Sequence, residues 1–326
     1  MTRASGIGSW PGTDPGAANG SIRNLLADDG LPYLAELPER GPGADLIGRG
    51  AALLVDLPVE LIPSGWRHAD APGRDAGRAR GYLTSDLDAL AEIYDGYAGP
   101  LKIQAAGPWT LAASVELPRG ERTLTDPGAV GDLVASLAEG LARHAAEVAR
   151  LIPGAELVVQ VDEPSLPSVL AGRLPTASGY GRVRSVAAET VEAGLRTVLE
   201  SVAGHRTVLH CCDRSIPLPL LRRAGTAGVA LDTTVLGPNG WESLAASVEE
   251  GIELYAGCLP ATGATDPRTA AAALLRGWHE VGLEAARLAD VVVTPACGIP
   301  ALSPAQASAV TRATRDVANE VAEAAA

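Results

Sequence analysis

The sequence predicts an α/β fold, a single (β/α)8 TIM barrel with long loops at the C-terminal face of the strands. Short apolar runs recur along the 326 residues, and each is followed by turn residues and then by a stretch of helical periodicity. Eight such units match the size of a TIM barrel, about 250 residues plus insertions. We therefore expect one catalytic domain over residues 1–326. A doubly wound open sheet is the alternative that the same alternation allows.

The expected strands are short apolar runs that end in a turn. In chain order they are Ser5–Ser9, Ala51–Asp56, Leu101–Ala106, Leu157–Asp162, Thr207–Cys212, Gly228–Asp232, Leu254–Leu259 and Val291–Pro295. The expected helices repeat apolar residues at steps of three and four: Gly128–Leu151, Ser185–Val202, Trp241–Glu253, Asp266–Leu288 and Ser303–Ala325. Ser303 is a typical N-cap, with Pro304 in the first helical position. The Gly- and Pro-rich segments Gly12–Arg49 and Pro63–Arg80 are expected to be loops.

Composition excludes several classes of function. The chain has 26 Lys and Arg against 39 Asp and Glu, which argues against a nucleic-acid partner. No signal-peptide core or membrane-spanning apolar stretch is present in the sequence, so we expect a cytoplasmic protein with no membrane contact. No glycine-rich nucleotide motif follows the first expected strand. In a reducing compartment, the four cysteines are better interpreted as metal ligands or nucleophiles than as a disulfide framework.

Polar residues gather at the ends of expected strands, where a barrel forms its active site. His210 and Cys212 are two residues apart on an extended strand, so their side chains share one face. Cys297 and Asp232 follow two other strands and would complete a set of N, S, S and O ligands suited to tetrahedral zinc. The alternative is a buried histidine beside thiols that act as small apolar groups. Cys211 and Cys258 are expected to be packing residues.

Motifs spread from Ile7 to Gly298 carry a resemblance to a known family. They are Ile7-Gly8-Ser9-Trp10-Pro11, Gly107-Pro108-Trp109-Thr110, Gln160-Val161-Asp162-Glu163-Pro164-Ser165-Leu166, His210-Cys211-Cys212, Asp232-Thr233-Thr234 and Pro295-Ala296-Cys297-Gly298. Together they resemble the catalytic C-terminal barrel of the cobalamin-independent methionine synthases, in its single-barrel form.

This resemblance implies a zinc-dependent methyltransferase that moves a methyl group to the thiol of homocysteine and forms methionine. It implies zinc ligation by His210, Cys212 and Cys297, with Asp232, water or the substrate sulfur in the fourth position. Asp162 would bind the substrate ammonium and hold the thiol for reaction. Ile7, Gly8 and Ser9 would hold the carboxylate, and Trp109 would form a wall of the site. The competing interpretations are a turn cap for Asp162 and simple packing for Trp109.

The sequence departs from the family pattern at several positions. The family's acidic residue after the sixth strand is usually glutamate, where Asp232 stands here, and its glutamate after the second strand has only Asp56 and Glu60 as nearby candidates. The family's histidine after the seventh strand, which helps to protonate the departing folate, is missing from Ala256–Thr262. The N-terminal barrel of the two-barrel enzymes is also missing. We therefore expect the methyl donor to be either methyltetrahydrofolate or a methylated corrinoid protein.

Other functions remain open at the level of sequence. One is a zinc-thiolate alkyltransferase for another small thiol such as coenzyme M, which would need no amino-acid clamp. Another is a non-catalytic barrel that binds zinc or a corrinoid. A porphyrinogen-type decarboxylase is disfavoured, because its acidic substrate would require a basic mouth and the net charge of the chain is −13.

Overall fold

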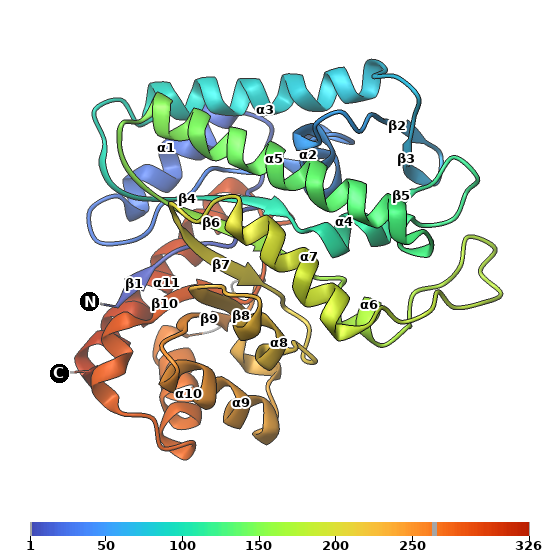
Figure 1. Ribbon diagram of the computed structural model, residues 1–326. Helices are drawn as coiled ribbons and strands as arrows, with labels where there is room; N and C mark the ends of the chain where they lie inside the picture. The colour runs from blue at the N-terminus through green and yellow to red at the C-terminus, as the bar shows by residue number, and fades with distance from the viewer. Residues whose placement is uncertain (1, 263–265, 326) are drawn as a thin grey trace.

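A curved, seven-stranded parallel sheet forms the centre of the computed structural model, which describes residues 2–262 and 266–325 (Figure 1). Neighbouring strands follow the order β1-β10-β9-β8-β7-β6-β4. Their bounds are β1 Arg3–Ala4, β4 Ala98–Ala106, β6 Gly154–Asp162, β7 Arg206–His210, β8 Gly228–Asp232, β9 Glu253–Leu259 and β10 Val292–Pro295. The predicted strands from Leu101 onward all lie in this sheet, so the prediction of a parallel α/β fold is confirmed.

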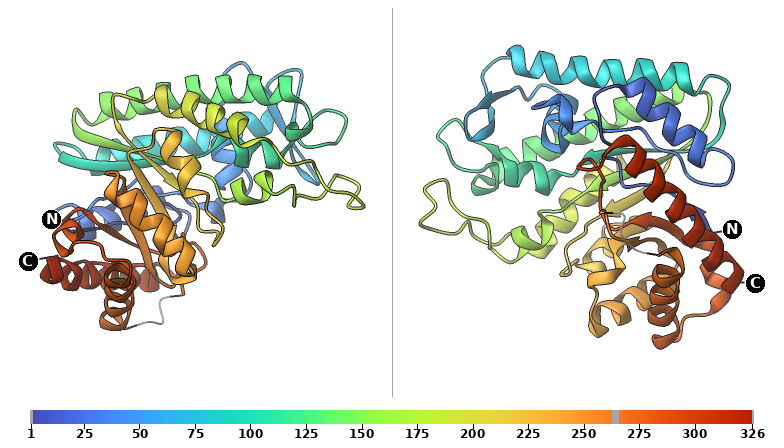
Figure 2. Two further views of the ribbon diagram at one scale, coloured as in Figure 1. Left: turned by 60° about the horizontal axis from the view of Figure 1, so that its bottom comes forward. Right: turned by 180° about the vertical axis from the view of Figure 1, so that it is seen from behind.

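Helices cover the outer face of the sheet (Figures 1 and 2). They are α1 Pro15–Leu26, α2 Leu46–Leu53, α3 Arg74–Ile93, α4 Pro108–Ser114, α5 Pro127–Leu151, α6 Leu166–Leu170, α7 Ala188–Glu200, α8 Leu218–Arg223, α9 Pro238–Glu249, α10 Pro267–Glu280 and α11 Pro304–Ala325. Short 3-10 helices are η1 Pro38–Arg40, η2 Thr123–Thr125, η3 Thr233–Val235 and η4 Ala285–Asp290. Among the described residues, none of these helices has the length and apolar character needed to cross a membrane.

The second expected strand, Ala51–Asp56, is wrong, because residues 51–53 form the last turn of α2. Residues 31–37 lie between the two edges of the sheet instead. On one side, Leu31 N donates to Ala4 O at 2.8 Å, and on the other, Leu34 N donates to Lys102 O at 2.9 Å. These residues include Pro32 and form only isolated bridges, so the described part of the chain has seven regular strands in this sheet instead of eight.

The first expected strand is also misplaced. The regular strand β1 covers only Arg3–Ala4, and the expected run Ser5–Ser9 follows it. Ser5 N still donates to Val293 O at 2.9 Å, but the backbone then leaves the ladder with β10. Beyond Ser5 this segment is held by contacts outside the ladder with β10, which include an isolated bridge between Ser9 and Glu36. These contacts matter for the candidate site described below.

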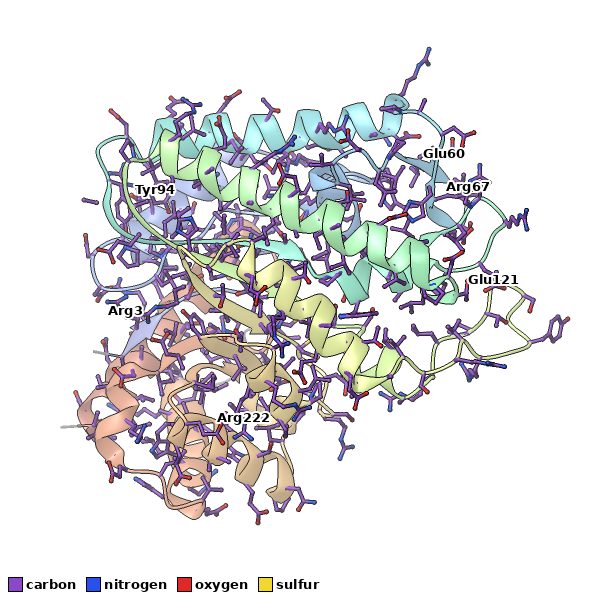
Figure 3. The ribbon with its side chains drawn as sticks, viewed as in Figure 1. Arg3, Glu60, Arg67, Tyr94, Glu121 and Arg222 are labelled. Atoms are coloured by element: carbon purple, nitrogen blue, oxygen red, sulfur yellow. The ribbon has the colours of Figure 1, made fainter. Side chains whose placement is uncertain are left out.

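The two expected loops contain regular structure, which corrects that prediction. Gly12–Arg49 includes α1, η1 and part of α2, and Pro63–Arg80 includes a strand and the start of α3. A separate small sheet joins β2 Val59–Ile62, β3 Gly65–His68 and β5 Val115–Glu116. Figure 3 shows Glu60 and Arg67 beside each other on this small sheet, where they form an ion pair.

Helix starts follow a shared local rule. Asp14, Asp126 and Asp266 each accept hydrogen bonds from backbone N–H groups of the first turn, and each precedes a proline in the first helical position. The expected start of the last helix is confirmed, since α11 begins at Pro304. Ser303 and Gln306 exchange hydrogen bonds there in a capping box.

The inner face of the sheet carries an apolar layer and then a polar layer. Leu31, Val158, Val208, Ala230, Tyr255 and Val292 form a buried cluster of their own, separate from the main core between sheet and helices. Two residues further along the same strands, the inward positions become Gln160, His210 and Asp232. The polar side chains therefore gather toward the C-terminal ends of the strands.

Candidate functional site

Asp162 and His210 lie side by side at the ends of two neighbouring strands. They are register partners across β6 and β7, so their side chains point to the same face of the sheet. His210 Nδ1 lies 2.8 Å from Asp162 Oδ1, and both residues are buried. A carboxylate can only accept, so the ring proton is on Nδ1. His210 Nε2 is buried and has no hydrogen-bond partner among the described residues, which leaves its lone pair free to bind a metal.

Cys212 and Cys297 bring their thiols together from distant strands. Cys212 follows β7 and Cys297 follows β10, with β8 and β9 between them. At about 4.8 Å per strand, a flat sheet would separate these strands by roughly 14 Å. The two sulfur atoms are nevertheless 3.9 Å apart, because the sheet curves and the strand ends converge. Two thiolates bound at 2.3 Å to a tetrahedral zinc ion would be about 3.8 Å apart.

The hydrogen bond between the two thiols shifts their pKa values in opposite directions. The hydrogen bond that Cys297 shares with Cys212 lowers the pKa of Cys297 to about 6, and the charge of His210 adds to this effect. The same hydrogen bond raises the pKa of Cys212. The remaining cysteines, Cys211 and Cys258, are buried, and burial raises the pKa of each to about 12. A thiolate therefore forms more readily within the Cys212–Cys297 pair than at either of the other two cysteines.

The Asp232 carboxylate is hydrogen-bonded within its own turn and not to Cys212 or Cys297. Its Oδ1 accepts from the backbone N of Thr234 at 2.9 Å and from the Thr234 hydroxyl at 2.6 Å, which caps η3. Within residues 2–262 and 266–325, no group of three or more His, Cys, Asp or Glu side chains is gathered as a ready metal site. The structure thus brings Cys212 to Cys297 and His210 to Asp162, while Asp232 is engaged in its own turn.

Ile7, Gly8 and Ser9 follow β1, and the first two are buried while Ser9 is half-buried. Gly8 has a φ of 155°, and a Cβ built there would lie 2.9 Å from the Gln104 side chain, so the position requires glycine. A Cβ on Gly298 would lie 2.9 Å from Ser9, which places Ser9 against the loop that carries Cys297. The segment predicted to hold the carboxylate is therefore packed between β4 and the cysteine loop.

Lys102, the single lysine of the chain, lies inside the curved sheet below this segment. Its side chain is fully buried, with Nζ 5.2 Å from the centre of the Tyr33 ring. Nζ donates to Ile7 O at 2.8 Å and lies 3.4 Å from Gln104 Oε1. Burial lowers the pKa of Lys102 to about 8, although Asp162 and Glu36 oppose this effect. The Lys102 ammonium thus lies close enough to Asp162 and Glu36 to interact with both carboxylates.

Glu36 is the site residue that the sequence analysis missed. It lies on the 31–37 segment, and its backbone N donates to Gly8 O at 3.1 Å. The Ser9 hydroxyl lies 3.4 Å from Glu36 Oε2. Burial raises the pKa of Glu36, and the charge of Arg49 opposes that rise. Asp56 and Glu60, the nearest sequence candidates for an acidic group on the second strand, lie after α2 and on the small sheet.

A buried ion-pair network supports Glu36. Arg49 Nε lies 3.5 Å from Glu36 Oε1, and the other end of the Arg49 guanidinium pairs with Asp86 of α3. Asp86 also pairs with Arg40 at 2.7 Å, and its side chain is fully buried. The position of Glu36 is therefore linked to the long helix α3, which the sequence analysis expected to be partly a loop.

Glu163 and Trp109 connect β6 to α4. The Glu163 carboxylate accepts hydrogen bonds from Trp109 N at 2.9 Å and from Thr110 N and Oγ1, both at 2.7 Å. Burial raises the pKa of Glu163 to about 7. The Trp109 ring is buried and donates from Nε1 to Val191 O of α7 at 3.0 Å. The ring thus packs between helices, and it also lines a cavity of about 620 Å³ beside the loop of residues 171–187.

Comparisons with known proteins support the fold. The sequence matches no protein-family model and no curated protein sequence. The structure is similar to that of a B12-independent methionine synthase from Shewanella sp. W3-18-1 in complex with selenomethionine, with a TM-score of 0.67 and 13% identity. That match covers 99% of this chain and 98% of the other. At this identity, the similarity establishes a related TIM-barrel-like α/β fold.

A second group of structures is more distant. The carboxyl transferase domain of Rhizobium etli pyruvate carboxylase has a TM-score of 0.35 and 14% identity over 84% of this chain and 47% of that chain. Such a low score supports no functional comparison.

Proposed function

We propose that this protein is a zinc-dependent methyltransferase that transfers a methyl group to the thiol of homocysteine and forms methionine. The observation that carries the proposal is the convergence of Cys212 and Cys297, whose sulfur atoms lie 3.9 Å apart although two strands separate β7 from β10. The similar overall fold of a B12-independent methionine synthase that binds selenomethionine supports the same conclusion. The closed eight-stranded barrel belongs to this proposal, with residues 31–37 in place of the second strand.

Three residues have the ligand types that zinc prefers, although in the described residues they are not gathered into one group. His210 offers an unpartnered Nε2, and the hydrogen bond from its Nδ1 to Asp162 is the support that metal-bound histidines commonly have. Cys212 and Cys297 offer sulfur ligands at a spacing that suits tetrahedral coordination. When bound, zinc would lower the pKa of the substrate thiol, which is about 8.5 when free, so that a thiolate is available at neutral pH.

The remaining residues would hold the amino-acid part of homocysteine. Asp162 and Glu36 are buried carboxylates, and both suit a substrate ammonium. Gln160 connects Asp162 to Ile7, and Glu36 is bonded to Gly8 and Ser9. The backbone of Gly8 and Ser9 would receive the substrate carboxylate, above the buried charge of Lys102. Orientation by such contacts fixes the sulfur for in-line attack on the methyl group. Trp109 would not contact the substrate directly. Its ring packs against α7, and its backbone N holds Glu163, the residue next to Asp162.

For the methyl donor, we propose a methylated corrinoid protein rather than methyltetrahydrofolate. A folate nitrogen leaves well only when it is protonated in the transition state, and the Ala256–Thr262 segment supplies no histidine for this role. The side chain next to the end of β9 is instead the buried Cys258, a thiol whose pKa burial raises to about 12. A corrinoid leaves without protonation and needs no such acid.

Zinc content tests the metal site. We expect about one zinc per chain in the purified protein, and loss of zinc in Cys212→Ala, Cys297→Ala and His210→Ala. Cys211→Ala and Cys258→Ala are matched controls that should keep it, because both of these thiols are buried and neither is a proposed ligand. Full zinc retention in all three ligand variants would exclude the proposed site.

Methyl transfer tests the reaction and the donor. Purified zinc protein is incubated with homocysteine and either methylcobalamin or methyltetrahydrofolate, and methionine is quantified. We expect turnover with methylcobalamin and little with the folate. Efficient turnover with free folate would overturn the donor assignment. Alkylation of coenzyme M in preference to homocysteine would favour the alternative alkyltransferase, and zinc binding without alkylation of any thiol would favour a binding protein.

A further inference from the structure

The carbonyl oxygen of Ile7 accepts two hydrogen bonds from side chains inside the curved sheet. One comes from Lys102 Nζ on β4 at 2.8 Å, and the other from Gln160 Nε2 on β6 at 2.9 Å. Ile7 lies beyond the last ladder pair of β1 with β10, at Ala4 and Val293. The Ile7–Ser9 segment is therefore fixed across the interior by side chains of two strands.

Gln160 also contacts Asp162. The Ile7–Ser9 segment, which would bind the substrate carboxylate, and Asp162 with Glu36, which would bind its ammonium, are here called the amino-acid clamp. Its Nε2 donates to Asp162 Oδ1 at 2.7 Å, in addition to Ile7 O. The amide orientation is determined by these partners, because both are acceptors and only the NH2 group can donate to them. Gln160 is fully buried, so its rotamer is fixed by packing.

We propose that Gln160 is a specificity-determining positioning residue that, together with Lys102, sets the spacing between the carboxylate-binding segment Ile7–Ser9 and the ammonium-binding Asp162. This inference rests on the proposed function. The ammonium and carboxylate of an α-amino acid share one carbon, so their separation is fixed. A site with a matching fixed spacing binds both groups at once, and it discriminates against thiols that carry only one of them.

Gln160 and Lys102 contact different parts of the amino-acid clamp, so substituting each one should change the binding of different substrate groups. Gln160 contacts both Ile7 O and Asp162, whereas Lys102 Nζ contacts Ile7 O and Gln104. Loss of the Gln160 amide therefore affects both halves of the clamp. Loss of the Lys102 ammonium affects the carboxylate half.

The test compares homocysteine with two thiols that each lack one group. 4-Mercaptobutyrate keeps the carboxylate, and 3-aminopropanethiol keeps the amine. Dissociation constants for the zinc protein are measured by calorimetry for wild type, Gln160→Met and Lys102→Met, with zinc content checked in each. Thr226→Val is the control, since it removes a buried hydrogen bond to Gly228 O at 2.7 Å, near the start of β8.

In wild type we expect homocysteine to bind about 100-fold more tightly than either analogue. In Gln160→Met this advantage falls about tenfold or more, measured on protein loaded with zinc to the wild-type level. In Lys102→Met, homocysteine and 4-mercaptobutyrate weaken together and 3-aminopropanethiol does not. Thr226→Val behaves as wild type.

Two outcomes overturn the inference in distinguishable ways. If wild type prefers homocysteine but folded Gln160→Met keeps the full preference, the positioning role is wrong and the proposed function stands. If wild type does not prefer homocysteine over the two analogues, the amino-acid clamp itself is wrong. Should Gln160→Met fail to fold, equal weakening of all three thiols in Lys102→Met contradicts the proposal.

Discussion

Asp162 and His210 are register partners on β6 and β7, and their side chains are hydrogen-bonded at 2.8 Å. The bond fixes the histidine proton on Nδ1 and leaves Nε2 as the only ring nitrogen able to bind a metal. Parallel pairing places the two residues side by side, so the geometry follows from the register of two strands rather than from a loop.

The first prediction concerns this bond. Asp162→Ala should weaken zinc binding by about 10–100-fold, because the imidazole loses the group that orients it and raises its basicity. Zinc affinity is measured by competition with a chromogenic chelator. Asp213→Ala is the control, since Asp213 caps the backbone of Ser215 in the loop after β7. Equal zinc affinity in Asp162→Ala and wild type would contradict a metal role for His210.

The second prediction concerns Glu36. Glu36→Gln should raise the KM for homocysteine about 10–100-fold, since a charge-assisted hydrogen bond to the ammonium becomes a neutral one. The kcat at saturating homocysteine should change little. Glu39→Gln is the matched control, because Glu39 is close in the sequence and only accepts a hydrogen bond from Gly12 N at 3.0 Å on the surface. An unchanged KM in Glu36→Gln would remove Glu36 from the clamp.

Of the eight expected strands, six are confirmed and two are not, Ser5–Ser9 and Ala51–Asp56. The second of these failures has a physical reason. Runs such as Leu157–Asp162 are buried on both faces and end in a turn, so their pattern is strong. Residues 31–37 have Pro32 inside and Pro38 after them, and they pair by isolated bridges only. The apolar run Ala51–Asp56 was the stronger local pattern, but its first half is the end of α2.

The residues of the candidate site that follow regular strands were predicted, and the one on an irregular segment was not. His210, Cys212, Cys297 and Asp162 stand at the ends of regular strands, where sequence pattern and barrel geometry combine. Glu36 lies within the irregular segment of residues 31–37, so no strand pattern predicts it. Its signal is the run Leu34-Ala35-Glu36-Leu37, in which a charged residue stands among apolar ones that are all fully buried. A buried charge within such a run indicates a partner, which the structure identifies as Arg49.

The third prediction uses two glycines. A Cβ on Gly107 would lie 2.4 Å from the Glu163 carboxyl group, so Gly107→Ala must displace the carboxylate that three donors bind. We expect a loss of about 2 kcal/mol or more in the free energy of unfolding. Gly77→Ala, inside α3 with no atom within 4 Å of its Cβ, should add about 0.5–1 kcal/mol. Urea denaturation measures both, and a stable Gly107→Ala would exclude a rigid link between β6 and α4.

The fourth prediction concerns His144 on α5, whose burial, together with the charge of Arg49, lowers its pKa to about 4, against the opposing effect of Glu147. Between pH 6.5 and pH 4 the unfolded chain binds a proton at this residue that the folded chain does not, so the free energy of unfolding falls as the pH falls. A pKa of about 4 in place of 6.5 corresponds to roughly 3 kcal/mol, present in full above pH 6.5 and lost by pH 4. His144→Leu should remove this loss. Urea denaturation from pH 7.5 to pH 4 should give a flatter pH profile for His144→Leu than for wild type or for the exposed control His279→Leu. Parallel profiles for all three proteins would show that His144 does not control acid stability.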